Sequence, residues 1–293
     1  MGILAPHARE VYSRAVDSRL RRALKAATDE HYRDAALYDY EYRRRRSDVR
    51  WYRALARATG GPVLELGCGS GRLLAPLARD GHEVVGVDLS RTMLARCRER
   101  VARAGRAAAA RVTLVRGDFR ALALGRRFPL VVCPFNAFMH LYALDDVERF
   151  LASVRAHLAP GGTFAFDVLN PDLRWLARDP SKRWARTRFR HPSTGKRLVY
   201  SLEIDFDVPL QIAFMTIHYE PDAGERARTR VVRLAHRYFF PRELDALLRY
   251  NGFAVERHDG GFDAQPLAND SDEQVLRCRA YGKTMRGSSR RGR

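Results

Sequence analysis

The sequence is poor in lysine and cysteine, and it has no apolar run long enough to cross a bilayer. Its four cysteines lack the CxxC spacing of a zinc site, so we expect no metal and interpret them as reduced, buried thiols: Cys68, Cys97, Cys133 and Cys278. The first residues, MGILAPHARE, lack the basic and long apolar segments of a secretory signal. These absences predict a cytoplasmic protein with no membrane partner.

The positive charge comes almost entirely from arginine. Four of the 53 basic residues are lysine and 49 are arginine, and the formal net charge is +19. Such a charge is compatible with a nucleic-acid partner. The arginines are nevertheless spread along the chain, and this bias with abundant alanine is typical of a GC-rich genome. Nucleic acid is therefore the less favoured partner, and we expect the basic tail, 283–293, to be disordered.

Hydrophobic patterning divides the chain into four regions. Residues 1–58 are rich in alanine and arginine and predict an N-terminal helical segment. Short apolar runs alternate with helical patterns over 59–183, and the same pattern returns over 241–282. This alternation predicts an α/β fold whose doubly wound sheet has five strands in the first part and two in the second, seven in all.

The alternation of strands and helices stops between residues 184 and 240. The segment RLVYSLEIDFDV is apolar at every second position: Leu198, Tyr200, Leu202, Ile204 and Phe206. Two further strand-like segments follow without a helix between them. We therefore predict a three-stranded antiparallel insertion after the fifth strand.

The clearest functional signal is PVLELGCGSG, residues 62–71. Gly67, Gly69 and Gly71 follow an apolar strand and would let a ligand lie close to the backbone, although a tight turn alone could also need them. Asp88 ends the next apolar run, where an acid can bind ribose hydroxyls. The acid Glu65 would repel a pyrophosphate but attract a sulfonium. These features favour S-adenosylmethionine over NAD.

The same segments resemble the class I S-adenosylmethionine-dependent methyltransferases from about residue 38 to residue 281. LELGCGSGR is similar to the first motif of that family, GVDLS to the second and LVRGDFRAL to the third. The resemblance implies a Rossmann-like fold and S-adenosylhomocysteine as product. It places Asp88 on the ribose and Asp118 on the adenine amine, although either acid could instead cap a helix. The cofactor-binding residues that it implies are Glu65, Gly67, Cys68, Gly69, Gly71, Asp88, Leu89, Met93, Asp118, Phe119 and Cys133.

Two other segments resemble small-molecule N-methyltransferases, including the glycine and sugar-amine enzymes. VVCPFNAFMHL is similar to their segment after the fourth strand, which implies that Asn136 and His140 face the methyl group or its acceptor. YDYEY is similar to their N-terminal tyrosine segment, which implies that Tyr38 lies over the cofactor and Arg45 holds its carboxylate. Asn136 could instead cap a turn, His140 could be structural, and the tyrosine and arginine side chains could form a solvated surface.

The resulting hypothesis is an enzyme that transfers a methyl group to a nitrogen or oxygen of a small molecule. We expect the N-terminal helices and the insertion to form a lid, and a neutral His140 with a pKa near the working pH to be the general base. An RNA or protein methyltransferase, or a non-catalytic cofactor-binding module, is the alternative. The end of the fourth strand, CPFN, differs from the Asn/Asp-Pro-Pro-aromatic sequence of base-flipping enzymes. The sequence leaves the acceptor, the methylated element and the oligomeric state open.

Overall fold

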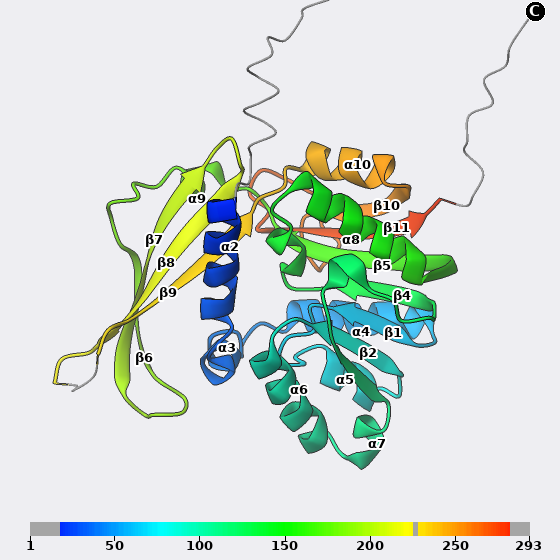
Figure 1. Cartoon of the computed structure of the whole chain (residues 1–293), viewed down its shortest axis with the longest axis horizontal. Helices are drawn as coiled ribbons and strands as arrows, with labels where there is room; N and C mark the ends of the chain where they lie inside the picture. Colours follow the sequence, from blue (N-terminus) through cyan, green and yellow to red (C-terminus); the bar gives the residue numbers. More distant parts are fainter. Residues whose placement is uncertain (1–17, 225–227, 282–293) are drawn as a thin grey trace, which may run out of the picture.

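The computed structural model describes residues 18–224 and 228–281, and it contains two sheets with helices between and around them (Figure 1). The predicted helical segment before residue 18 and the basic tail lie outside these residues. Three helices come first in the described part: α2 (Ser18–His31), α3 (Ala35–Glu41) and α4 (Ser47–Thr59). The α3 helix begins after Asp34, whose carboxylate accepts a hydrogen bond from the backbone N–H of Leu37 at 3.0 Å.

The larger sheet has seven strands in the order β10-β11-β5-β4-β1-β2-β3. Its strands are β1 (Val63–Leu66), β2 (Val84–Asp88), β3 (Val112–Arg116), β4 (Phe128–Cys133), β5 (Leu158–Leu169), β10 (Phe253–Asp259) and β11 (Glu273–Ala280). The first five are parallel, whereas β11 runs antiparallel to both of its neighbours. Strand order reverses between β1 and β4, so the carboxyl ends of these two strands border the crevice in which such folds bind ligands.

Helices cover both faces of this sheet. The α4 helix packs on one face with α5 (Leu74–Arg79) and α6 (Arg91–Arg103), and α7 (Arg106–Ala109) lies beside them. The opposite face is covered by α8 (Leu144–His157) and α10 (Pro241–Tyr250). Ser90 caps α6 by accepting a hydrogen bond from Met93 N–H at 3.3 Å, which fixes the helix directly after the end of β2.

The insertion is a separate antiparallel sheet in the order β6-β7-β8-β9, joined to β5 through α9 (Leu173–Leu176). Its strands are β6 (Trp184–Arg190), β7 (Arg197–Asp207), β8 (Ile212–Pro221) and β9 (Arg230–Arg237). The prediction of three strands was wrong by one, because β6 reads WARTRFR and is mostly exposed, so it carries no apolar alternation. The predicted α/β class, the seven-stranded sheet and the antiparallel insertion after β5 are confirmed.

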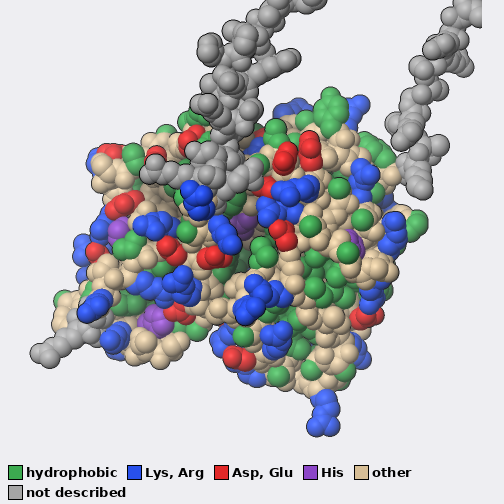
Figure 2. All heavy atoms as spheres, in the orientation of Figure 1, with side chains coloured by type: hydrophobic (Ala, Val, Ile, Leu, Met, Phe, Trp, Pro, Cys, Tyr) green, Lys and Arg blue, Asp and Glu red, His purple; other side chains and the backbone are tan. Residues whose placement is uncertain are grey.

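The insertion lies at the carboxyl end of the parallel strands. Helix α2 packs on β9, and β9 contacts the short helix η2 (Ala137–His140), which directly follows β4. Figure 1 shows α2 and α3, in dark blue, between the insertion sheet and the core. None of the described helices is both long and apolar enough to span a bilayer. On the face shown in Figure 2, basic side chains are scattered over the insertion and the core rather than gathered in one patch.

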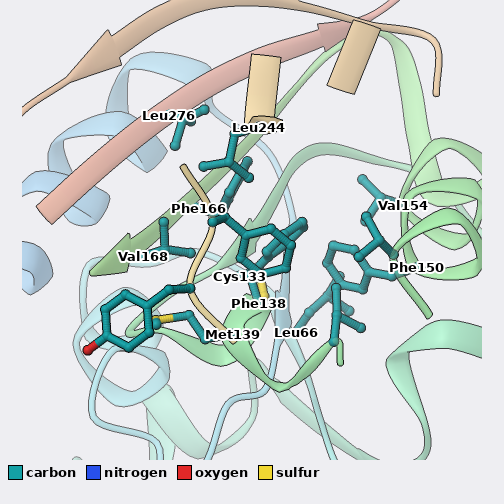
Figure 3. Packing of buried hydrophobic residues seen from close by; sticks show 14 of the residues in the cluster. Leu66, Cys133, Phe138, Met139, Phe150, Val154, Phe166, Val168, Leu244 and Leu276 are labelled. Carbon is teal, nitrogen blue, oxygen red and sulfur yellow. The ribbon is translucent and has the colours of Figure 1, made fainter. Parts of the chain in front are cut away.

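Phenylalanine side chains form the centre of the core on the α8 face (Figure 3). The Phe166 ring is fully buried, and its centroid lies 4.7 Å from that of Phe138 and 5.0 Å from that of Phe164. Phe138 belongs to η2 and Phe166 to β5, so this stack holds the segment after β4 against the sheet. Aromatic packing therefore supports the loop that carries Asn136 and His140.

Replacing Phe166 with alanine should lower the free energy of unfolding by about 3–5 kcal/mol, because a large ring is removed from a site that cannot refill. Urea unfolding followed by circular dichroism measures this change. The matched control is Leu173→Ala, whose side chain is 61% exposed and which should change stability by no more than about 0.5 kcal/mol. Equal effects of the two substitutions would contradict the assigned core.

Candidate active site

The turn after β1 is tied to the end of β2 by one acid. Gly67, Gly69 and Gly71 have φ angles of 73°, 53° and 77°, which favour glycine. Asp88 accepts a hydrogen bond from Gly69 N–H at 2.8 Å and another from Ser90 N–H at 2.8 Å. A Cβ at Gly67 would lie 2.8 Å from the Cβ of Ala137 in η2, so the missing side chain lets the loops after β1 and β4 meet.

Two acids beside this turn have no basic partner. Glu65 is only 2% exposed, and its Oε2 has no hydrogen-bond partner among the described residues. Burial raises the pKa of Glu65 well above its usual range, and the neighbouring Cys97 raises it further. Burial also raises the pKa of Asp88, against the effect of the hydrogen bonds from Ser90 and Gly69. Within the described part of the chain, no basic side chain lies within 4.0 Å of either carboxylate.

The loop after β4 has an unusual backbone. Phe135 and Asn136 have φ angles of 56° and 63°, and the left-handed region costs a non-glycine residue such as Phe135 about 1–3 kcal/mol. Phe135 N–H donates to the Asp167 carboxylate at 2.8 Å, and the Tyr52 hydroxyl donates to the same oxygen at 2.7 Å. Burial raises the pKa of Asp167 to about 6. Asn136 is buried, and its Oδ1 has no partner among the described residues.

His140 lies in a chain of hydrogen bonds that joins three parts of the molecule. Its Nε2 is 2.8 Å from the Tyr32 hydroxyl, and its Nδ1 is 3.0 Å from the Tyr142 hydroxyl. Tyr142 donates its one proton to the carbonyl of Ala235 in β9 at 2.9 Å, so Nδ1–H of His140 is the donor to Tyr142. Nε2 then accepts the proton of Tyr32. The sequence gave no indication of Tyr32 or Tyr142 in this role.

Burial keeps this histidine neutral. The pKa of His140 is lowered to about 3, first by burial and then by the neighbouring His31, so the expected value near the working pH is not found. Burial likewise lowers the pKa of His31 to about 4. The pKa of His236, whose ring centroid is 5.1 Å from that of His140, is lowered well below its usual range, again mainly by burial. Three uncharged imidazoles thus gather at the end of β4.

Tyr38 lies where the N-terminal helices meet the loop after β4. Its ring centroid is 4.8 Å from that of Tyr42, 5.6 Å from that of Tyr32 and 6.2 Å from that of Phe135. Burial raises the pKa of Tyr38 well above its usual range, with smaller contributions from neighbours that include Asp88. The structure therefore brings Tyr38, Asp88 and the loop after β4 to one region.

Arg45 and Arg72 flank the ring of Phe135, at 4.9 and 4.4 Å from its centroid. Arg45 is paired with Glu273 and, at 3.5 Å, with Asp48. Arg72 also binds Asp48, through an Nη1 contact of 3.0 Å. The charge of Arg45, predicted to hold a carboxylate, is thus already balanced by two acids. Arg72 was missed, although it directly follows the glycine segment.

Asp118 takes the capping role that the sequence left open. It accepts a hydrogen bond from Arg120 N–H at 2.9 Å at the start of η1 (Phe119–Ala121) and pairs with the Arg120 side chain at 2.6 Å. Burial would raise the pKa of Asp118, but Arg120 outweighs it and holds the pKa below its usual range. Of the other predicted cofactor residues, Phe119 packs on Phe150, Leu89 is 57% exposed, and three are buried: Cys68, Met93 and Cys133.

The hydrogen-bond acceptors of this region fit S-adenosylmethionine. The orphaned oxygens of Glu65 and Asn136 are acceptors whose burial is costly without a partner, and a ligand with N–H groups and positive charge would supply one. Asp88 is half-buried at the end of β2. Unpaired acids would repel a pyrophosphate, so the same residues do not suit NAD.

Comparisons with known proteins agree with this fit. Residues 63–162 match the family model described as a methyltransferase domain. A dTDP-3-amino-3,4,6-trideoxy-alpha-D-glucopyranose N,N-dimethyltransferase of Streptomyces venezuelae is 28% identical over 205 residues, which cover 68% of this chain and 78% of that enzyme.

Solved structures give the same result. The CcbJ methyltransferase of Streptomyces caelestis superposes with a TM-score of 0.68 and 28% identity, covering 80% of this chain and 90% of that one. The glycopeptide N-methyltransferase MtfA, solved with S-adenosyl-L-methionine, superposes with a TM-score of 0.54 and 28% identity, covering 80% of this chain and 94% of that one. The chain belongs to the class I S-adenosylmethionine-dependent methyltransferases and is homologous to sugar-amine N,N-dimethyltransferases and small-molecule N-methyltransferases.

Proposed function

We propose that the enzyme methylates a nitrogen atom of a small-molecule amine, where the carboxyl end of the parallel sheet meets the insertion. The observation that carries this proposal is the partly buried chain Tyr32–His140–Tyr142 at the carboxyl end of β4. The relatives support the class of acceptor, since they are named for N-methylation of an amino sugar and of a glycopeptide. Helix α2 and the insertion would act as the lid that excludes water.

We assign the cofactor to the crevice between the ends of β1, β2 and β4. Asp88 would bind the ribose hydroxyls, and the backbone from Gly67 to Gly71 would lie along the methionyl part, with Glu65 behind it. Arg45 and Arg72 are both candidates for its carboxylate, although Asp48 competes for each of them. Asp118 would have to leave Arg120 in part to contact the adenine amine. When bound, S-adenosylmethionine supplies a methyl group that a neutral nucleophile can displace from sulfur without further activation.

The environment of His140 favours nitrogen over oxygen as the methylated atom. The burial that lowers the pKa of His140 to about 3 would also lower that of an amine bound beside it, so the amine would present its free electron pair. A hydroxyl group needs a much stronger base than an imidazole with this pKa. His140 stays the candidate base, acting through Tyr32, whose hydroxyl oxygen can accept a proton while it donates its own to Nε2.

The proposed proton path predicts that His140→Ala and Tyr32→Phe each lower kcat by about 10²-fold or more. Both should leave the Kd of S-adenosylhomocysteine within about twofold, and the double variant should be no slower than the worse single one. Initial-rate kinetics with an amine acceptor and calorimetry measure these quantities. The pKa of His140 is about 3, so this group does not titrate near pH 6.5. The pH–rate profiles of the wild type and of His140→Ala should therefore have the same shape in that range.

The matched control is His82→Ala, which removes a half-buried imidazole just before β2, at the amino end of the parallel strands and thus opposite to the end that carries His140. It should keep the wild-type rate. If His140→Ala also keeps its rate, the imidazole is structural, and catalysis rests on alignment and desolvation alone.

The proposed cofactor site predicts that S-adenosylhomocysteine binds and NAD does not. Asp88→Ala should weaken the binding of S-adenosylhomocysteine by about 1.5–3 kcal/mol, the cost of losing hydrogen bonds to a charged group. Calorimetry measures the affinity, and Asp145→Ala, on the exposed start of α8, should leave it unchanged. Binding of NAD, with none of S-adenosylhomocysteine, would overturn the assignment.

A further inference from the structure

Another acid, Glu41, connects the end of α3 to the insertion sheet. Glu41 is the last residue of this helix, and its Oε1 accepts a hydrogen bond from the Tyr219 hydroxyl at 2.7 Å. Tyr219 belongs to β8 and is 3% exposed. Burial raises the pKa of Glu41, although the hydrogen bond from Tyr219 opposes this. The carboxylate is thus held in place by a neutral donor.

Glu41 has no basic partner among the described residues, whereas the other acids of α3 and its cap do. Its neighbours on the same helix and its cap are paired: Asp34 with Arg230 at 2.8 Å and Asp39 with Arg96 at 2.8 Å. Among the side chains that the structure describes, no arginine, lysine or histidine nitrogen lies within 4.0 Å of the Glu41 carboxylate. A carboxylate left in this state has its negative charge available for a cation.

Aromatic rings surround this carboxylate. The Tyr219 ring centroid is 5.9 Å from that of Tyr200 and 6.1 Å from that of Phe189. The charge of Glu41 contributes to the raised pKa of both Tyr42 and Tyr200, for which burial is the larger cause, so both phenols lie close to it. An acid beside several aromatic rings is a combination that can recognise ammonium groups.

Glu41 is too far from His140 to act on the same atom. His140 packs on His236, which pairs with Ala213 of β8, whereas Glu41 is bonded to Tyr219 of the same strand. Six residues separate Ala213 from Tyr219, which is about 20 Å of strand. A group held by Glu41 is therefore at the other end of a molecule whose reacting nitrogen lies beside His140.

A cleft of about 650 Å³ lies at the surface between α2, α3, α6 and β9. Its lining includes Asp34 and Arg230, whose charges also act on Glu41, and it includes none of the predicted cofactor or catalytic residues. The volume suits a small molecule. The cleft borders the first turn of α3, whereas Glu41 ends that helix, so the cleft lies beside the Glu41 cluster and does not include it.

We propose that Glu41, Tyr42, Tyr200 and Tyr219 form a cation subsite, so that the acceptor carries a positively charged group in addition to the neutral amine that is methylated. This inference rests on the proposed function for the position of the reacting atom. It assigns to Glu41 a role in selecting the acceptor. The expected substrates are compounds with two basic groups separated by up to about 20 Å, as strand geometry allows.

The test uses the full chain and two isosteric probes, choline and 3,3-dimethylbutan-1-ol, which differ only in charge. Calorimetry with saturating S-adenosylhomocysteine, at ionic strength matched with sodium chloride, should give choline a Kd at least about tenfold lower than the alcohol. Glu41→Gln keeps an oxygen that can accept the Tyr219 hydrogen bond, so it should raise the Kd of choline to that of the alcohol. Tyr200→Leu should weaken the binding of choline more than that of the alcohol.

The matched control is Glu148→Gln, which removes the same charge from the exposed face of α8 and should leave the choline preference intact. Equal binding of the two probes, binding of neither, or a preference that survives Glu41→Gln would overturn the subsite. The Kd of S-adenosylhomocysteine should be the same in the wild type and Glu41→Gln. If the wild type fails to bind S-adenosylhomocysteine, that result contradicts the proposed function and not the subsite. The comparison of choline with the alcohol, made without S-adenosylhomocysteine, then still tests Glu41.

Discussion

The hydrogen bonds from Gly69 and Ser90 to Asp88 are the constraint on which the rest of the site depends. One carboxylate fixes the turn after β1, the end of β2 and the first turn of α6, because its two oxygens accept from both segments. The turn can come this close only because its glycines adopt positive φ angles, and Gly67 leaves room for Ala137. The loops after β1 and β4 therefore meet, and the buried oxygens of Glu65 and Asn136 are brought to the same crevice.

The pairing of carboxylates with arginine determines which acids are available for ligands. In a chain with 49 arginines, most sequestered carboxylates acquire a guanidinium partner, as Asp48 does from Arg72 and Asp146 from Arg120. Four acids have a pKa raised by burial and no basic nitrogen within 4.0 Å among the described side chains: Glu41, Glu65, Asp88 and Asp167. All four lie where the insertion, the N-terminal helices and the strand ends converge. The large positive charge is thus compatible with the binding of a cationic ligand, because arginine does not neutralise these four carboxylates.

Local signals in the sequence were sufficient for the fold class and the cofactor. The glycine spacing, Glu65 and Asp88 lie within 24 residues of one another, and their chemistry can be read without tertiary contacts. Contacts between distant residues could not be read in this way: His140 meets Tyr32 across 108 residues, and Tyr142 meets Ala235 across 93. The pKa of His140 depends on burial by α2 and β9, so its sequence neighbours gave the wrong value. Strand β6 was missed because its position is set by pairing with β7 rather than by an apolar pattern.

Burial has two opposite consequences for the proposed reaction. It favours the neutral form of an amine beside His140 before transfer, because a charged group is poorly solvated there. After transfer, the new bond from nitrogen to carbon leaves the positive charge on nitrogen, and the same environment destabilises it. The product must then release a proton or leave the site. In the proposed mechanism Tyr32 would accept this proton at its oxygen while its own proton passes to Nε2 of His140, and the proton would reach solvent as the product leaves. A base with a low pKa suits this task, since it passes the proton on instead of retaining it.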